Sequence, residues 1–172
     1  MTTPKLICIL GAESTGKTTL ACALAAHFHA LWVPEYLREF CETQQRTPHQ
    51  NEQAHIIEQQ LSAEQAALDK LHGRYVFCDT APLLTAIYSD YVFNDRSLYP
   101  RARTLHQRYA LTLFLQPDIA WVADGRQRDG AHVQKPISVL IERELVSINA
   151  PFQRVAGERT QSAIDSLAQL EC

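Results

Sequence analysis

Residues 11–18 read Gly-Ala-Glu-Ser-Thr-Gly-Lys-Thr and match the pattern G-x-x-x-x-G-K-[ST] in full. The match follows an apolar run typical of a buried strand and opens a stretch with helical spacing, which is the context that this pattern requires. Gly11 and Gly16 allow a tight turn that points backbone N–H groups at phosphate oxygens, and the N-terminus of the following helix adds positive charge. We expect Lys17 to reach the β- and γ-phosphates and the Thr18 hydroxyl to bind Mg²⁺.

The pattern therefore predicts a phosphate-binding loop, against the alternative of a chance glycine-rich turn before a helix. The residues expected to bind the nucleotide are Gly11, Glu13, Ser14, Thr15, Gly16, Lys17, Thr18 and Thr19.

Short apolar runs predict the strands of a parallel sheet at residues 5–10, 30–33, 75–78 and 111–115, with a weaker run at 152–156. The first four are almost continuously apolar, as strands covered on both faces are. Stretches with helical spacing lie between the runs, and Pro136 is expected in the first turn of the helix before the last strand. The order β-α-β-α-α-β-α-α-β-α-β-α predicts an α/β fold with a five-stranded parallel sheet and helices on both faces. No linker interrupts the pattern, so we expect residues 1–172 to form a single domain.

Acidic side chains follow two of the predicted strands. Glu35 comes shortly after the run that ends at Val33, and Asp79 directly follows Cys78. Ligands of open α/β sheets lie outside the carboxyl ends of the strands, so both carboxylates are expected near the phosphate-binding loop. Phosphoryl transfer needs one group that orients the metal and another that accepts the proton of the attacking hydroxyl. The alternatives are a solvated loop acid for Glu35 and a helix N-cap for Asp79.

A polar segment after the fourth predicted strand carries Arg126 and Arg128 between two glycines. Such a segment is typical of a lid that closes over the transferring phosphate, neutralises charge and excludes water; a solvated polar loop is the alternative. Residues 157–160, Gly-Glu-Arg-Thr, follow the fifth strand. We expect the backbone at Gly157 either to approach an adenine ring or to form an ordinary strand–helix connection.

The composition excludes several classes of protein. The chain has 46% hydrophobic and 20% charged residues, as an ordinary globular domain does, and its net charge of −3 argues against a nucleic-acid-binding face. The five cysteines include no CxxC pair, which argues against a metal finger. No apolar stretch is long enough to span a membrane, and the N-terminal residues lack the features of a signal peptide, so we expect a cytoplasmic location.

Four sequence pieces occur in order along the chain: the loop at 11–18, Val-Pro-Glu-Tyr-Leu-Arg-Glu-Phe at 33–40, Asp-Thr at 79–80 with Thr85, and Trp-Val-Ala-Asp-Gly-Arg at 121–126. Together they resemble the ribosylnicotinamide kinase domain of the NadR-like family of AAA-type ATPases and kinases, over nearly the whole chain. The resemblance implies a P-loop kinase fold with an arginine-bearing lid. It also implies that ATP and Mg²⁺ are used to phosphorylate the 5′-hydroxyl of nicotinamide riboside, which gives nicotinamide mononucleotide.

On the matching positions, the resemblance implies that Glu35 is the base near the attacking hydroxyl, that Asp79 serves the metal and that Arg126 belongs to the lid, with Arg128 as a second candidate. The implied substrate-binding residues are Glu35, Tyr36, Arg38, Asp79, Trp121 and Asp124.

The chain departs from the family where aromatic side chains are expected to enclose the nicotinamide ring. One expected position holds Pro34 and the other falls at Ala66 and Ala67. Trp32 and Tyr36 are candidates to replace the missing rings.

A nucleoside kinase that uses ATP and Mg²⁺ is therefore the expected function. The alternative is a regulatory switch that hydrolyses ATP or GTP slowly, although the sequence has no Asn-Lys-x-Asp guanine motif. A pure binding module is disfavoured by the combination of Lys17, Thr18, Glu35 and Asp79. The expected partner is a nucleoside-like small molecule, with neither nucleic acid nor membrane, and formation of a homo-oligomer is left open.

Overall fold

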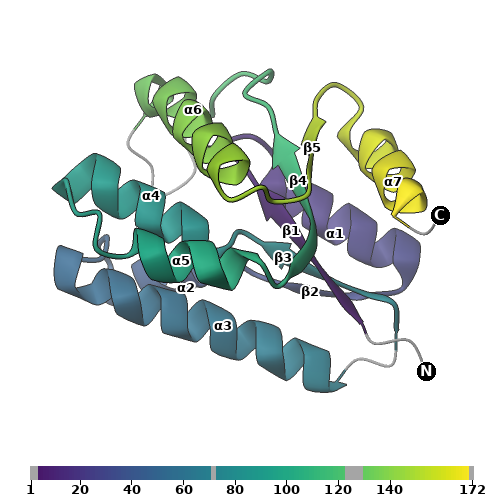
Figure 1. Cartoon of the computed structure of the whole chain (residues 1–172), viewed down its shortest axis with the longest axis horizontal. Helices are drawn as coiled ribbons and strands as arrows, with labels where there is room; N and C mark the ends of the chain where they lie inside the picture. The colour runs from purple at the N-terminus through teal and green to yellow at the C-terminus, as the bar shows by residue number, and fades with distance from the viewer. Residues whose placement is uncertain (1–3, 71–72, 123–129, 171–172) are drawn as a thin grey trace.

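A parallel sheet runs through the middle of the molecule (Figure 1). The computed structural model describes residues 4–70, 73–122 and 130–170. The strands are β1 (Lys5–Leu10), β2 (Leu31–Val33), β3 (Tyr75–Asp79), β4 (Tyr109–Leu115) and β5 (Phe152–Val155). Their order across the sheet is β2-β3-β1-β4-β5, and all neighbours are parallel. Because β1 lies at the centre, the loop that follows it leaves the middle of the carboxyl edge, where the strand order reverses and ligands bind.

Helices cover both faces of the sheet (Figure 1). One face carries α1 (Lys17–Phe28) and α7 (Arg159–Gln169), and the other carries α3 (Gln53–Lys70), α4 (Pro82–Phe93), α5 (Tyr99–His106) and α6 (Ala131–Ser147). The shorter α2 (Tyr36–Gln44) and a 3₁₀ turn (Gln50–Glu52) lead into α3. Within the described residues, no helix combines the length and the apolar character of a membrane-spanning segment.

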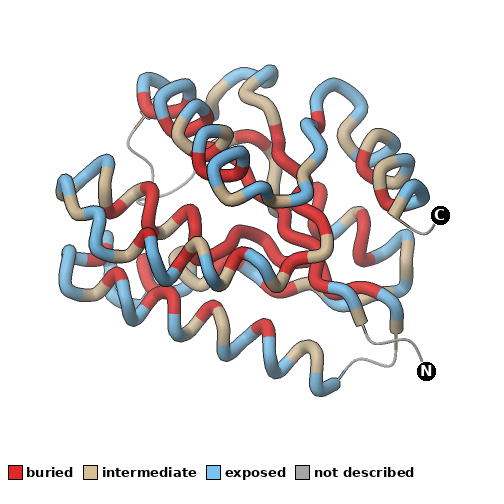
Figure 2. Tube along the Cα trace, viewed as in Figure 1, coloured by how far each residue is buried: buried red, intermediate tan, exposed pale blue. Residues whose placement is uncertain are grey.

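The central strand shows why the apolar runs are continuous. Leu6, Cys8 and Leu10 belong to the cluster formed with α4 and α6, whereas Ile7 and Ile9 belong to the cluster formed with α1 and α7. Every one of these side chains is buried, and Figure 2 shows the strands as the most deeply buried part of the chain. Burial of one such large aliphatic side chain contributes about 1.5–3 kcal/mol, so the two clusters hold helices against both faces.

The predicted order of helices and strands is confirmed, while some element ends differ from the prediction. β4 begins at Tyr109 rather than Leu111, because Tyr109 is buried with its hydroxyl donating to the Glu64 carboxylate at 2.8 Å. The placement of Pro136 in a first helical turn is wrong, since α6 begins at Ala131 and Pro136 lies in its interior. Val133 and Gln134 of the preceding turn are buried and hold it against the protein, although the proline lacks the N–H group that would bond back to that turn.

Candidate active site

The loop between β1 and α1 has the backbone shape that its glycines allow. A Cβ atom on Gly11 would lie 2.6 Å from the Thr15 hydroxyl oxygen, so no larger residue fits there. Gly16 has a φ of +87°, a left-handed conformation that favours glycine, and it caps the N-terminus of α1. The Lys17 Nζ donates a hydrogen bond of 3.0 Å to the carbonyl of Ala12, which holds the ammonium group at the loop. The N-terminus of α1 and this lysine together have the positive character that suits an anion.

Asp79 lies beside this loop as the last residue of β3. Its carboxylate accepts a hydrogen bond of 2.5 Å from the Thr18 hydroxyl, which joins the end of β3 to the first turn of α1. The N-cap of α4 is Ala81, so the alternative of a capping role for Asp79 is wrong. Burial, and then the negative charge of Glu35, raise the pKa of Asp79, whereas Lys17 and Thr18 oppose the shift.

Thr18 and Asp79 fit a magnesium site. The Asp79 Oδ1 atom is buried and has no hydrogen-bond partner in the part of the chain that the structure describes, which leaves an oxygen available to a cation. No cluster of three or more His, Cys, Asp or Glu side chains suited to a metal occurs among the described residues. Mg²⁺ does not need such a cage, because it is usually held by one or two protein oxygens together with water and substrate phosphates.

Glu35 lies at the N-cap of α2 and is only 9% exposed, so the alternative of a solvated loop acid is wrong. Within the described structure its side chain makes no capping hydrogen bond to the helix. Glu35 instead lines a cavity together with Lys17 and Arg38, and the positive charge of Arg38 lowers the pKa of Asp79. The carboxylates of Glu35 and Asp79 and the positive charges of Lys17 and Arg38 thus lie close enough to influence one another electrostatically.

The cavity has a volume of about 710 Å³ and two kinds of lining. The phosphate-binding loop, Glu35 and Arg38 supply the polar part, and residues 119, 120 and 122 after β4 complete the wall beside the loop. An apolar wall comes from α2, α4 and the segment between α2 and α3. It consists of Leu37, Cys41, Pro48, Leu84, Tyr88, Val92 and Phe93. A cavity of this size and mixed character is typical of a small-molecule site.

Most of the residues predicted from the sequence meet at this cavity. Those that line it are Glu13, Ser14, Thr15, Gly16, Lys17, Thr18, Thr19, Glu35 and Arg38. Among the described residues, five predicted ones are not part of its lining: Gly11, Tyr36, Asp79, Trp121 and Gly157. Gly11 shapes the loop, and Asp79 reaches the site through Thr18. The roles of all these residues in binding and catalysis remain predictions.

Two of the other predicted residues, Tyr36 and Gly157, make contacts away from the cavity. The Tyr36 ring lies 6.0 Å from the ring of His55 and packs beside the small cluster of Phe40, Cys41 and Ile56. The N–H of Gly157 donates to the Asp118 carboxylate at 2.7 Å, so this donor is already used within the protein. Asp124, predicted to bind the substrate, and Arg126 and Arg128, predicted to belong to a lid, lie outside the described residues.

The aromatic side chains of the cavity come from a helix that the sequence did not single out. Pro34 is exposed, and Trp32 packs on the opposite face of the sheet with α1. Tyr88 and Phe93 of α4 line the cavity instead. The signal that could have found them is positional, because α4 directly follows Asp79 and its apolar residues occur all around the helix.

These features define the class of the molecule, which is a P-loop nucleotide-binding protein with the fold of the small P-loop kinases. The chain belongs to the AAA domain family, whose model matches residues 6–161.

The comparisons with individual proteins agree with the resemblance found in the sequence. The chain is 25% identical over 169 residues to the trifunctional NAD biosynthesis/regulator protein NadR of Escherichia coli K12, which covers 90% of this chain and 38% of that protein. The Salmonella typhimurium LT2 protein of the same name is also 25% identical, over 88% of this chain and 38% of its own length. The chain therefore spans well under half the length of these relatives, and its similarity to the NadR-like family is confirmed.

Solved structures share the fold. A crystal structure of NadR protein in complex with NR matches with a TM-score of 0.86 and 24% identity, over 98% of this chain and 52% of that one. Deoxyadenosine kinase from M. mycoides with bound dATP matches with a TM-score of 0.60 and 16% identity, over 95% of this chain and 99% of that one.

Proposed function

We propose that this protein is an ATP- and Mg²⁺-dependent nucleoside kinase that phosphorylates the 5′-hydroxyl of nicotinamide riboside. The observation that carries the proposal is the arrangement of one cavity, in which Lys17 and Thr18 lie on the phosphate side and Glu35 lies in the same wall. The NadR relatives support the choice of acceptor, since their name places them in NAD biosynthesis and one structure holds NR. The deoxyadenosine kinase supports the broader class of nucleoside kinase.

The position of each residue indicates its role in the reaction. The loop N–H groups and Lys17 bind and orient the β- and γ-phosphates of the donor. Thr18 and Asp79 would hold Mg²⁺, which supplies neutralising charge to the phosphate oxygens when it is bound. Glu35 accepts the proton of the acceptor hydroxyl, because it is a buried carboxylate that lines the cavity. Arg38 adds positive charge beside the two acids.

The apolar wall gives the acceptor a place to lie. Tyr88 and Phe93 provide aromatic surface in the cavity, and a planar heterocycle that stacks on one ring gains about 0.5–1.5 kcal/mol beyond the area that it buries. In this chain the aromatic contact to the acceptor thus comes from α4 rather than from the position of Pro34.

An ADP-release assay with a nucleoside panel tests the proposal. The panel contains nicotinamide riboside, nicotinic acid riboside, adenosine and cytidine, together with a 5′-deoxy form of the best acceptor. ADP release must depend on the acceptor and vanish with the 5′-deoxy compound, and mass spectrometry must detect one added phosphate. Lys17→Met is the matched control, which we expect to fold and to be inactive. ADP release that is independent of any acceptor would establish the regulatory switch instead.

A further inference from the structure

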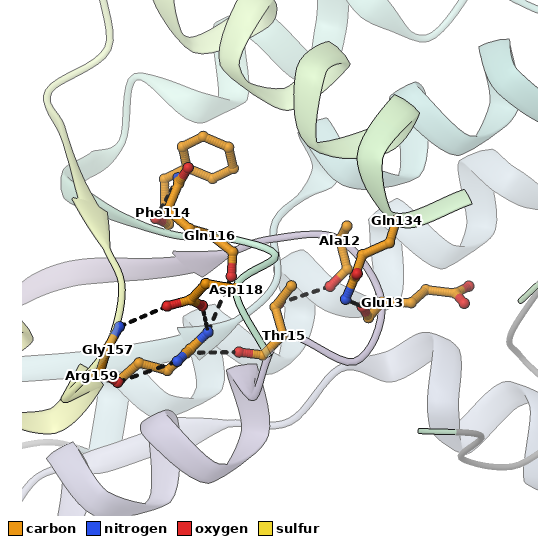
Figure 3. A network of polar contacts seen from close by, with 9 residues as sticks. All are labelled: Ala12, Glu13, Thr15, Phe114, Gln116, Asp118, Gln134, Gly157 and Arg159. Carbon is orange, nitrogen blue, oxygen red and sulfur yellow. Dashed lines mark hydrogen bonds and ion pairs between the residues drawn. The ribbon is translucent and has the colours of Figure 1, made fainter. Parts of the chain in front are cut away.

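Two side chains from the C-terminal half of the chain hold the phosphate-binding loop from outside (Figure 3). The Gln134 Nε2 of α6 donates to the carbonyl of Glu13 at 3.1 Å. The Arg159 Nε of α7 donates to the carbonyl of Thr15 at 3.0 Å. In the same loop, the carbonyl of Ala12 accepts from the Thr15 hydroxyl at 2.8 Å. The carbonyls of Ala12, Glu13 and Thr15 are therefore bound by donors of the protein itself.

The direction of these carbonyls decides whether the loop can bind phosphate. A peptide unit is planar, so a carbonyl that points outward turns the N–H of the next residue inward. Phosphate-binding loops work through several N–H groups that converge on one anion. Donors that capture the carbonyls of Glu13 and Thr15 thus set the direction of the N–H groups of Ser14 and Gly16.

Arg159 is itself fixed by its surroundings. Its guanidinium also donates to the carbonyl of Gln116 at 3.1 Å and forms an ion pair with Asp118, and its side chain is only 12% exposed. The Asp118 carboxylate accepts the N–H of Gly157 as well, and this hydrogen bond, with the contacts from Arg159, lowers the pKa of Asp118. The arginine therefore connects the phosphate-binding loop, the end of β4 and the turn after β5 in one network (Figure 3).

Gln134 is similarly enclosed, at 8% exposed, in the first part of α6. Within the described structure, neither Gln134 nor Arg159 is part of the cavity lining. Because both side chains contact loop carbonyls, the loop backbone is the route by which they can act on bound phosphates.

We propose that Arg159 and Gln134 are positioning residues that hold the phosphate-binding loop in its anion-binding conformation and thereby set the affinity for the phosphates of the donor. The inference rests on the proposed function only in taking the donor to be a nucleotide with Mg²⁺, and it is independent of the acceptor.

The test measures binding of ADP with Mg²⁺ by calorimetry, in the absence of any acceptor. The variants are Arg159→Met and Gln134→Met, in which an unbranched apolar side chain replaces the polar one and removes its donors. Arg154→Met and Gln161→Met are matched controls, because Arg154 makes an exposed ion pair with Glu142 and Gln161 an exposed hydrogen bond with Asp165.

We expect Arg159→Met to weaken ADP binding about tenfold to a hundredfold, and Gln134→Met about threefold to tenfold, because one contact is charged and the other is neutral. Arg159→Lys keeps the charge and a single donor nitrogen, so it should recover part of the loss. Both controls should bind ADP within about twofold of the parent. The KM for the acceptor should stay unchanged in every variant that retains activity.

Unchanged ADP affinity in folded Arg159→Met and Gln134→Met would overturn the proposal. A lower thermal unfolding midpoint with normal ADP affinity would overturn it as well, since the two residues would then be general stabilisers. If Arg159→Met does not fold, Gln134→Met and Arg159→Lys decide, because the first removes a single neutral hydrogen bond and the second keeps the positive charge beside Asp118. A parent protein that binds ADP but phosphorylates no nucleoside would refute the proposed function and leave this inference open to the same measurement.

Discussion

Replacement of Glu35 by glutamine is the sharpest test of the proposed chemistry, since the amide keeps the size of the side chain and cannot accept the proton. Loss of a general base costs about 10²- to 10⁴-fold in rate, which corresponds to about 2.7–5.4 kcal/mol in the barrier. Glu35 also lies at the start of α2, where a negative charge interacts favourably with the helix dipole. That interaction is worth about 0.3–1 kcal/mol, which corresponds to at most about a fivefold change in rate. Loss of the base and loss of the helix-dipole interaction therefore differ clearly in size.

The same helix supplies a matched control. Glu39 is also in the first turn of α2 but is exposed, so Glu39→Gln removes a charge near the helix start and leaves the cavity intact. Steady-state kinetics with saturating Mg·ATP should give Glu35→Gln a kcat at least a hundredfold below that of the parent, and Glu39→Gln a kcat within about fivefold. Binding of ADP with Mg²⁺ should remain normal in both. A Glu35→Gln rate within tenfold of the parent would refute the assignment of Glu35 as the base.

Three further variants probe other parts of the structure. Asp79→Asn should raise the Mg²⁺ concentration needed for activity. Because the pKa of Asp79 is raised in the folded protein, its negative charge lowers stability at neutral pH, and the variant should therefore melt at a higher temperature than the parent. This difference in melting temperature should shrink as the pH falls through the raised pKa of Asp79. Tyr88→Leu should raise the KM for the acceptor up to about tenfold with less effect on kcat, and an unchanged KM would exclude Tyr88 from the acceptor site. Burial lowers the pKa of His106 from 6.5 to about 4, so the parent should lose about 3 kcal/mol of stability as the pH falls from the pKa of the unfolded state through that of the folded state. The free energy of unfolding in urea should depend less on pH in His106→Gln than in the parent.

The sequence predicted the sheet and the phosphate-binding loop because both depend on local patterns. Buried parallel strands must be apolar on both sides, and the loop needs glycine at Gly11 and Gly16 for steric reasons that the structure confirms. The error at the start of β4 occurred where a polar group is satisfied by a distant partner. Tyr109 extends β4 because Glu64 accepts its hydroxyl, and no window of sequence around Tyr109 contains that acid.

The candidate site was predictable to a similar degree. Lys17, Thr18 and Glu35 were found because they belong to motifs or follow strands, and these positions converge in any parallel α/β sheet. Tyr88 and Arg159 were not found, since Tyr88 lies within an apolar helix and Arg159 contacts Thr15 across 144 positions of the chain. Only the packing of helices against the sheet brings such residues to the site.

The contacts of Gln134 and Arg159 with the loop have a consequence for how the protein acquires its binding capacity. They join positions separated by 121 and 144 residues, so the loop reaches its final form only after α6 and α7 have docked. Contacts between such distant positions carry a loop-closure cost that grows with their separation, so we expect them to form late in folding. Nucleotide affinity should therefore appear together with the last step of folding, and a bound nucleotide should slow the release of the C-terminal helices during unfolding.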